Sequence, residues 1–156
     1  MTMTPSRVLD GRPVAGRIKQ QLRQELASFE RRPRLAILSF QTPASTMYKT
    51  AQAAQAASLG IAITDQSYLL DVSMGEVERR IQQWNADPMI HGIFVHQPMP
   101  SQIDPQRVSA IINPLKDIEG IHPQNSARRF FAKARIGSCT ALAVMELLES
   151  TGVDLA

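Results

Sequence analysis

Three polar side chains recur at helical spacing shortly after the first apolar run of the sequence. Ser45, Tyr48 and Gln52 stand at positions i, i+3 and i+7, so a helix would place them on one face. A tyrosine ring can stack on a flat heterocycle while its hydroxyl reaches a reacting group. The same spacing also suits a tyrosine that only packs at the rim of a sheet.

A histidine and a glutamine follow a later apolar run. His96 and Gln97 precede Pro98-Met99-Pro100, a turn that ends a strand and fixes the direction of the chain. An imidazole with its ordinary pKa of about 6.5 can transfer protons at neutral pH, whereas Gln52 has no titratable proton. A lone histidine in such a turn is also commonly a structural hydrogen-bonding group.

Two carboxylates and a histidine share one short loop, at Asp117, Glu119 and His122. No second histidine lies close by at a metal-ligand spacing, so no metal site is predicted. A carboxylate here is better suited to accept paired N–H bonds from the edge of a guanidine-like heterocycle. The sequence contains no glycine-rich phosphate loop and no serine in a nucleophile elbow, which disfavours dinucleotide binding and serine-dependent hydrolysis.

Alternating apolar runs and turn residues predict the elements that position these side chains. Strands are expected at residues 35–40, 61–70 and 90–95, and helices at 14–29, 45–59, 73–85, 104–112 and 138–152. Gly60 is placed to end the second helix, and the Ser73 to Glu76 spacing predicts a capping box. This alternation predicts an α/β fold whose mainly parallel sheet holds its ligand at the carboxyl ends of the strands.

Composition restricts the class of protein. The 156 residues are 44% hydrophobic and 20% charged, which predicts one globular domain. No apolar run is long enough to span a membrane, and the net charge of +3 is too small to indicate nucleic-acid binding. The single Cys139 and the lack of an apolar leader favour a reducing, cytoplasmic location. The basic stretch at 128–135 is interpreted as a solvated loop. The alternatives are a phosphate-binding patch with aromatic stacking and capture of an anionic ligand tail.

Several short motifs occur in a fixed order along the chain. They are Val8-Leu9-Asp10-Gly11, Pro43-Ala44-Ser45 followed by Tyr48, His91-Gly92-Ile93-Phe94-Val95 followed by Pro98-Met99-Pro100, Asn113-Pro114 followed by Lys116-Asp117-Ile118-Glu119-Gly120-Ile121-His122-Pro123, and Cys139-Thr140. Together they resemble the bifunctional methylenetetrahydrofolate dehydrogenase/cyclohydrolase family. The resemblance implies that residues 1–156 form one folate-binding, catalytic-type domain with three α/β/α layers, without the family's NADP-binding Rossmann domain.

The resemblance also implies a set of site residues. Tyr48 would stack on the pterin or its aryl linker, and Glu119 would bind the pterin amino edge of a tetrahydrofolate derivative. Ser45, Gln97 and Pro98 complete the implied substrate-binding set. Arg128, Arg129 and Lys133 are candidates for contact with the glutamate tail.

Departures from the family pattern concentrate in the residues that would transfer protons. The family has a lysine where this chain has Gln52, a glutamine where it has His96, and an aspartate where it has Glu119. The family's Pro-Cys-Thr-Pro motif is represented by residues 138–141, Ser-Cys-Thr-Ala. His96, Gln52 and Tyr48 are therefore the predicted catalytic group, with His96 as the replacement acid or base.

Three functions fit this pattern. The first is a non-redox one-carbon enzyme that transfers the carbon of methylene- or methenyl-tetrahydrofolate to a second small-molecule acceptor or to water, without NADP. The second is a non-catalytic module that binds a folate or a partner. The third is an N-terminal fragment of a longer, divergent dehydrogenase/cyclohydrolase. The sequence does not specify the oligomeric state.

Overall fold

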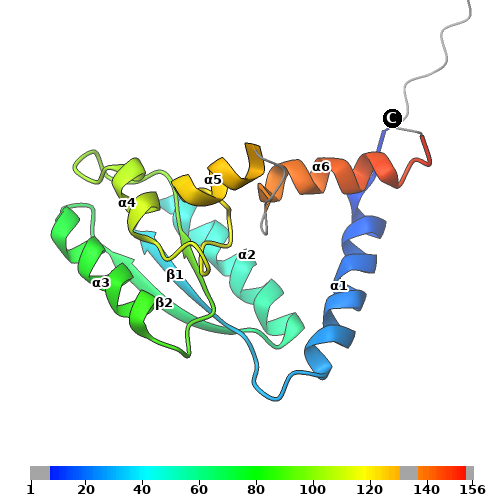
Figure 1. Cartoon of the computed structure of the whole chain (residues 1–156), viewed down its shortest axis with the longest axis horizontal. Coiled ribbons are helices and arrows are strands. Elements are labelled where there is room, and N and C mark those ends of the chain that lie inside the picture. The colour runs from blue at the N-terminus through cyan, green and yellow to red at the C-terminus, as the bar shows by residue number, and fades with distance from the viewer. Residues whose placement is uncertain (1–7, 131–136, 154–156) are drawn as a thin grey trace, which may run out of the picture.

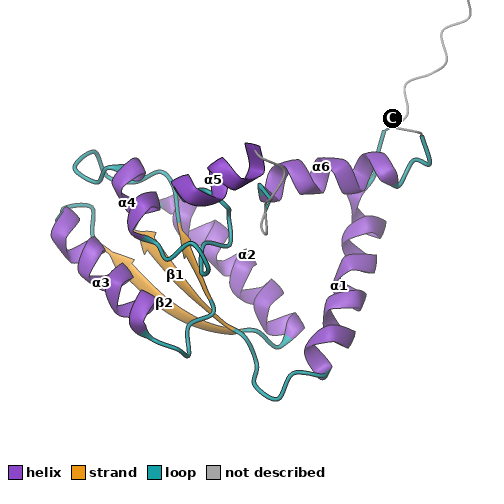
Figure 2. Ribbon diagram, viewed as in Figure 1, coloured by secondary structure: helices purple, strands orange, loops and turns teal. Residues whose placement is uncertain are grey.

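A computed structural model describes residues 8–130 and 137–153 as an α/β domain (Figures 1 and 2). The strands are β1 (Arg34–Phe40), β2 (Ala62–Tyr68) and β3 (Gly92–Val95). The helices are α1 (Gly11–Ala27), α2 (Pro43–Leu59), α3 (Met74–Ala86), α4 (Pro105–Ile111), α5 (Pro123–Phe130) and α6 (Cys139–Glu149). The predicted fold class is confirmed. Among the described residues, none of the helices is both long and apolar enough to cross a membrane.

The sheet is parallel, and β1 lies at its centre in the order β2-β1-β3. Leu38 pairs with Gln66 on one side and with Val95 on the other. Because side chains alternate between the two faces of a strand, Leu38 and Val95 share one face, and the next residues along both strands share the opposite one. The carboxyl ends of β1 and β3 therefore lie next to each other.

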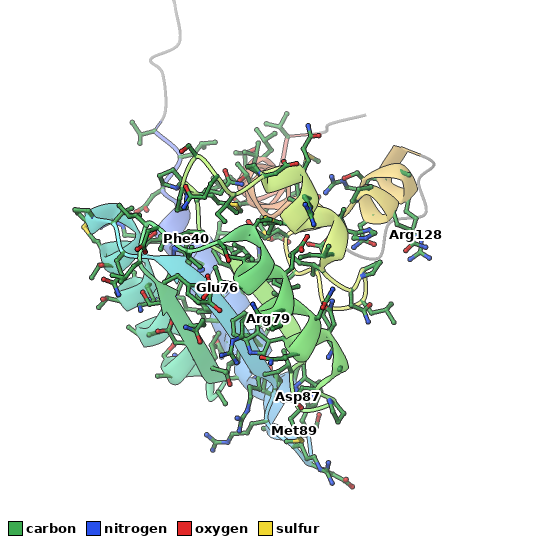
Figure 3. The ribbon with its side chains drawn as sticks, turned by 90° about the vertical axis from the view of Figure 1, so that its left-hand side faces the viewer. Phe40, Glu76, Arg79, Asp87, Met89 and Arg128 are labelled. Atoms are coloured by element: carbon green, nitrogen blue, oxygen red, sulfur yellow. The ribbon has the colours of Figure 1, made fainter. Side chains whose placement is uncertain are left out.

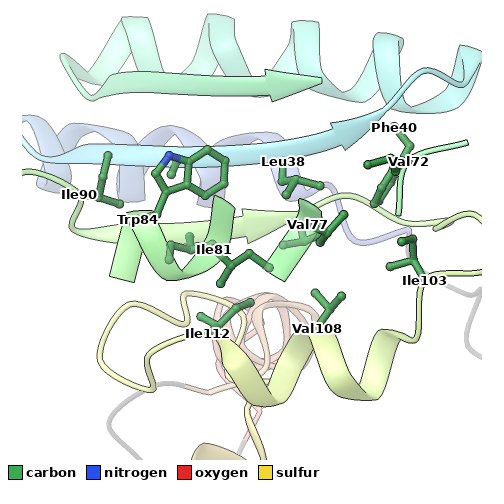
Figure 4. Packing of buried hydrophobic residues seen from close by; sticks show 13 residues of the cluster. Leu38, Phe40, Val72, Val77, Ile81, Trp84, Ile90, Ile103, Val108 and Ile112 are labelled. Carbon is green, nitrogen blue, oxygen red and sulfur yellow. The ribbon is translucent and has the colours of Figure 1, made fainter. Parts of the chain in front are cut away.

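Helices α3 and α4 cover one face of the sheet and enclose the main hydrophobic core (Figure 4). Val77, Ile81 and Trp84 of α3 are buried, as their spacing predicts. They pack with Leu38 of β1 and Val108 of α4 in one continuous cluster. Complete burial of a large apolar side chain contributes about 1.5–3 kcal/mol, so this face supplies much of the stabilisation of the sheet.

Local sequence signals set the helix ends. The capping box is formed, because the Ser73 hydroxyl accepts a hydrogen bond from the backbone N–H of Glu76, whose carboxylate accepts one from the Ser73 N–H. Gly60 ends α2 with a left-handed φ of 73°, a conformation that glycine adopts without steric cost. Asp104 caps α4 by accepting a hydrogen bond from the N–H of Gln106. These predicted boundaries are confirmed.

Two features differ from the sequence interpretation. Residues 123–130 form α5, so the basic stretch begins at the end of a helix and not in a loop. Lys133 and the rest of that stretch, residues 131–136, lie outside the described residues. The periodicity of α1 does predict a helix, yet none of its side chains is buried, because α1 stands beside α2 and α6 and away from the sheet (Figure 1).

The loop that follows α4 is attached to both β3 and α3. The backbone N–H of Ile93 donates to the carbonyl of Lys116 over 2.7 Å, and Ile93 and Asp117 form a parallel bridge. The Lys116 ammonium donates to the carbonyl oxygens of Trp84, Asn85 and Asp87 at 2.7–2.9 Å. A cation at the end of a helix satisfies carbonyls that have no partner within the helix. Lys116 thereby joins the loop to the end of α3.

Replacing Lys116 by methionine is expected to lower the free energy of unfolding by about 1–3 kcal/mol, because three helix-end carbonyls lose their charged donor. Urea denaturation followed by circular dichroism measures this change. Lys19→Met on α1 is the matched control and should leave the unfolding midpoint nearly unchanged. Equal effects of the two substitutions would show that Lys116 does not anchor this loop.

Candidate functional site

A cluster of three rings lies on the face of the sheet that α2 covers. Tyr48 of α2 is 5.3 Å from His96 between ring centroids, in an edge-to-face arrangement. Phe94 of β3 contacts both of them, at 6.2 Å from Tyr48 and 5.2 Å from His96. His96 is buried, whereas Tyr48 is 55% exposed. The exposed ring of Tyr48 thus offers a stacking surface beside a buried imidazole.

A hydrogen bond of 2.8 Å joins the Nε2 atom of His96 to the Oε1 atom of Gln52. An amide oxygen can only accept, so Nε2 carries the proton and donates it. In neutral imidazole the other nitrogen, Nδ1, then holds a lone pair. No described residue donates a hydrogen bond to that nitrogen. Gln52 therefore orients the ring so that Nδ1 is available as a base.

Burial and nearby charges determine the acidity of His96. The pKa of His96 is held below its ordinary value of 6.5, chiefly by burial and then by the positive charge of Lys49, while the negative charge of Asp65 opposes the shift. Lys49 of α2 forms an ion pair of 2.9 Å with Asp65 of β2. The neutral, basic form of His96 is consequently favoured at neutral pH.

Ser45, Gln97 and Pro98 have different surroundings from the ring cluster. Ser45 lies in the first turn of α2, where its backbone N–H donates to the Thr42 hydroxyl. Its own hydroxyl is buried and has no hydrogen-bond partner among the described residues. Gln97 and Pro98 are exposed just beyond β3 and are joined by a cis peptide bond. No aromatic or hydrogen-bonding contact among the described residues joins these two to Tyr48.

The two carboxylates of the loop after α4 occupy unlike environments. Asp117 is buried, and its carboxylate accepts hydrogen bonds from the backbone N–H groups of Ile121 and His122 and from the Asn125 amide. Glu119 is half-buried, and both its burial and the neighbouring charge of Asp117 raise its pKa. Asp117 thus holds the loop together. Among the described residues, no hydrogen bond joins Glu119 to Tyr48, Gln52 or His96.

The remaining histidines have structural partners. Nδ1 of His91 accepts a hydrogen bond from the backbone N–H of Arg34 at the start of β1. Nδ1 of His122 accepts one from the N–H of Gln124 at the start of α5. Within residues 8–130 and 137–153, no group of three histidine, cysteine or acidic side chains could hold a metal ion. Only His96 combines burial with contacts to the predicted catalytic residues.

Sequence reasoning did not identify Phe94, Lys49 or Asp65 as neighbours of His96. A signal existed for Phe94, because residues two apart in a strand share a face. Lys49 follows Tyr48 directly, but its partner Asp65 lies in another strand, and the pairing depends on how α2 crosses the sheet. Such a contact between distant segments leaves no pattern in the local sequence.

Comparison with known proteins identifies the family of the chain. A family model described as "Tetrahydrofolate dehydrogenase/cyclohydrolase, catalytic domain" matches residues 9–119. A relative from Mesorhizobium japonicum, named bifunctional protein FolD 2, is 35% identical over 154 residues, which cover 96% of this chain and 50% of the relative. The chain spans about half the length of the curated relatives it matches.

Solved structures show the same fold. The bifunctional FolD enzyme of Campylobacter jejuni matches 96% of this chain and 55% of its own, with a TM-score of 0.90 and 29% identity. A methylenetetrahydrofolate dehydrogenase-cyclohydrolase of Trypanosoma brucei, solved with NADP cofactor and inhibitor, matches 99% of this chain and 55% of its own, with a TM-score of 0.91 and 31% identity. The chain therefore belongs to the tetrahydrofolate dehydrogenase/cyclohydrolase family and corresponds to its catalytic domain.

Proposed function

We propose that this domain binds a reduced folate and moves its one-carbon unit without a redox step, with His96 as the proton-transferring group. The substrate is methylene- or methenyl-tetrahydrofolate, and the acceptor is water or another small nucleophile. The family membership supports a folate as the ligand, because the family description and the name of a similar solved enzyme both include tetrahydrofolate. The observation that carries the proposed chemistry is the Nε2 to Oε1 hydrogen bond between His96 and Gln52.

This hydrogen bond favours a base over an acid at Nδ1. When water attacks a methenyl carbon, a C–O bond forms and the water must lose a proton, which Nδ1 of His96 can accept. Opening of one C–N bond then requires a proton on the departing nitrogen, and the imidazolium can return it. As that C–N bond breaks, the new hydroxyl group loses its own proton to solvent and becomes the C=O of a formyl group, which stays on the other nitrogen. One water is consumed, one proton is released overall, and no hydride is exchanged.

Binding and chemistry would use different residues. Tyr48 would stack on the pterin or its aryl linker through its exposed ring. Glu119 would accept the paired N–H bonds of the pterin edge, and these two donors would favour its ionised form against the effect of burial. Gln52 is a positioning residue, because it acts through the imidazole. We assign no contact with the glutamate tail of folate to Arg128 and Arg129, because the adjoining residues 131–136 lie outside the described structure.

His96→Ala is expected to lower the rate of methenyl-tetrahydrofolate turnover by about 10²–10⁴-fold, with folate affinity preserved, because general-base assistance is lost. His91→Ala is the matched control, since His91 serves the start of β1 and should keep the wild-type rate. Turnover is followed by loss of methenyl absorbance and affinity by calorimetry. Tight folate binding with no turnover in the unaltered chain would favour the non-catalytic module.

The rate should fall as the pH drops through the pKa of His96, which lies below 6.5, because protonation removes the base. Lys49→Met removes a positive charge, so the pKa of His96 should rise and the loss of rate should begin at higher pH. Asp65→Asn removes a negative charge, so it should lower the pKa of His96 and move the loss of rate to lower pH. NMR titration of the imidazole in the ligand-free chain measures the same shifts, and two shifts of equal sign would contradict the arrangement.

Tyr48→Ala should weaken folate binding by about 1–3 kcal/mol, by analogy with the stacking of a base on an aromatic ring.

Glu119→Gln should weaken folate binding further than Tyr48→Ala does, since one acceptor of the paired hydrogen bonds becomes a donor. Phe29→Ala is the matched control for both substitutions, because Phe29 is also an exposed ring. Tyr68 does not serve as a control because it packs on the core. Wild-type affinity of both site variants for folate, measured by calorimetry, would show that folate binds elsewhere on the domain.

A further inference from the structure

A polar cleft lies between α3 and the edge strand β2, on the face of the sheet opposite the ring cluster. It has a volume of about 160 Å³ and is lined by Tyr68, Glu76, Arg79, Arg80 and Gln83. The four residues of α3 stand at helical spacing along one side of the helix, next to the stripe that faces the core. Figure 3 shows Glu76 and Arg79 at this place, well away from Arg128 of α5.

Positive charge exceeds negative charge in this cleft. Two guanidinium groups face one carboxylate, and within the described residues neither Arg79 nor Arg80 has a carboxylate at ion-pair distance. The Glu76 carboxylate is already engaged, because it accepts hydrogen bonds from both the N–H and the hydroxyl of Ser73. The hydrogen bonds from Ser73 lower the pKa of Glu76 more than the positive charge of Arg79 does. The net charge of the lining is +1.

One donor of the cleft lacks an acceptor. The Nε–H group of Arg80 is buried, and no described residue accepts a hydrogen bond from it. A buried N–H without an acceptor is costly, and a charged one more so. The side chain of Arg79, by contrast, is exposed. The arginine pair therefore combines a buried donor that lacks an acceptor with an exposed guanidinium group.

The cleft has room for a small anionic group. Its volume of about 160 Å³ is several times the roughly 30 Å³ that one water molecule occupies in the liquid. A phosphate or a carboxylate group therefore fits. Planar guanidinium groups bind both of these groups through paired, charge-assisted hydrogen bonds.

We propose that this cleft is a binding site for a small oxyanion, held between Arg79 and Arg80 with the Tyr68 hydroxyl and the Gln83 amide as further donors. The ligand is the phosphate or the carboxylate group of a small molecule, and the two share the same chemistry of recognition. The site is distinct from the ring cluster, because Tyr68 packs against the core on the α3 face while His96 contacts α2 on the other. It does not depend on folate binding.

The test is a titration of the full chain with inorganic phosphate and, separately, with acetate, observed by nitrogen–proton NMR. The Arg80 Nε–H signal and the backbone amides of residues 79–83 should shift with saturation. Arg80→Gln should weaken binding by about tenfold or more, since a charged hydrogen-bonding partner is lost. Tighter saturation by phosphate would identify a phosphate ligand, and tighter saturation by acetate a carboxylate.

Arg31→Gln is the matched control, because it removes the same charge from an exposed position outside this cleft. Gln83→Glu is a second test at an exposed helix position, where a new carboxylate should abolish binding while the fold is kept. Equal weakening by Arg31→Gln and Arg80→Gln would overturn the proposal, since attraction would then come from overall charge. Shifts centred on α5, or no saturation by either anion, would also overturn it.

Discussion

The position of β1 between β2 and β3 is the constraint from which the rest of the domain follows. Every residue of β1 from Ala36 to Phe40 is buried, so both faces of this strand must be covered. Ala36, Leu38 and Phe40 contribute to the core under α3 and α4. The alternate residues face α2. The register with β3 then leaves His96 next to Ser39, directly beneath the first turns of α2.

A buried imidazole is useful only if its tautomer and its charge are controlled. Loss of solvent disfavours the imidazolium, and the hydrogen bond to Gln52 fixes the proton on Nε2. A lysine at position 52 would donate to Nε2 instead of accepting from it, which is incompatible with this tautomer. The glutamine and the histidine are therefore chemically matched to each other. On the proposed function, the two departures from the family pattern would form one change.

Much of the fold was predictable because it is encoded locally. The capping box at Ser73, the glycine at position 60 and the apolar stripe of α3 each specify a boundary or a face within a few residues. Tyr48, Gln52 and His96 could be grouped because turns after parallel strands meet at one end of a sheet. The Lys49–Asp65 ion pair could not be predicted, and neither could α5, which is a helix of only 8 mostly polar residues.

The loop that carries Glu119 shows how the proposed binding residue can be placed without a hydrogen bond, among the described residues, to the proposed catalytic pair. Lys116 is held by the carbonyls at the end of α3, and Asp117 by two backbone N–H groups and Asn125, so the residues before Glu119 are fixed on both sides. The parallel bridge from Ile93 to Asp117 extends the sheet by one step beyond β3. Glu119 therefore takes its position from β3, the strand that His96 directly follows. Because one strand sets both positions, the Glu119 carboxylate and the His96 imidazole would keep their spacing even though no hydrogen bond among the described residues joins them.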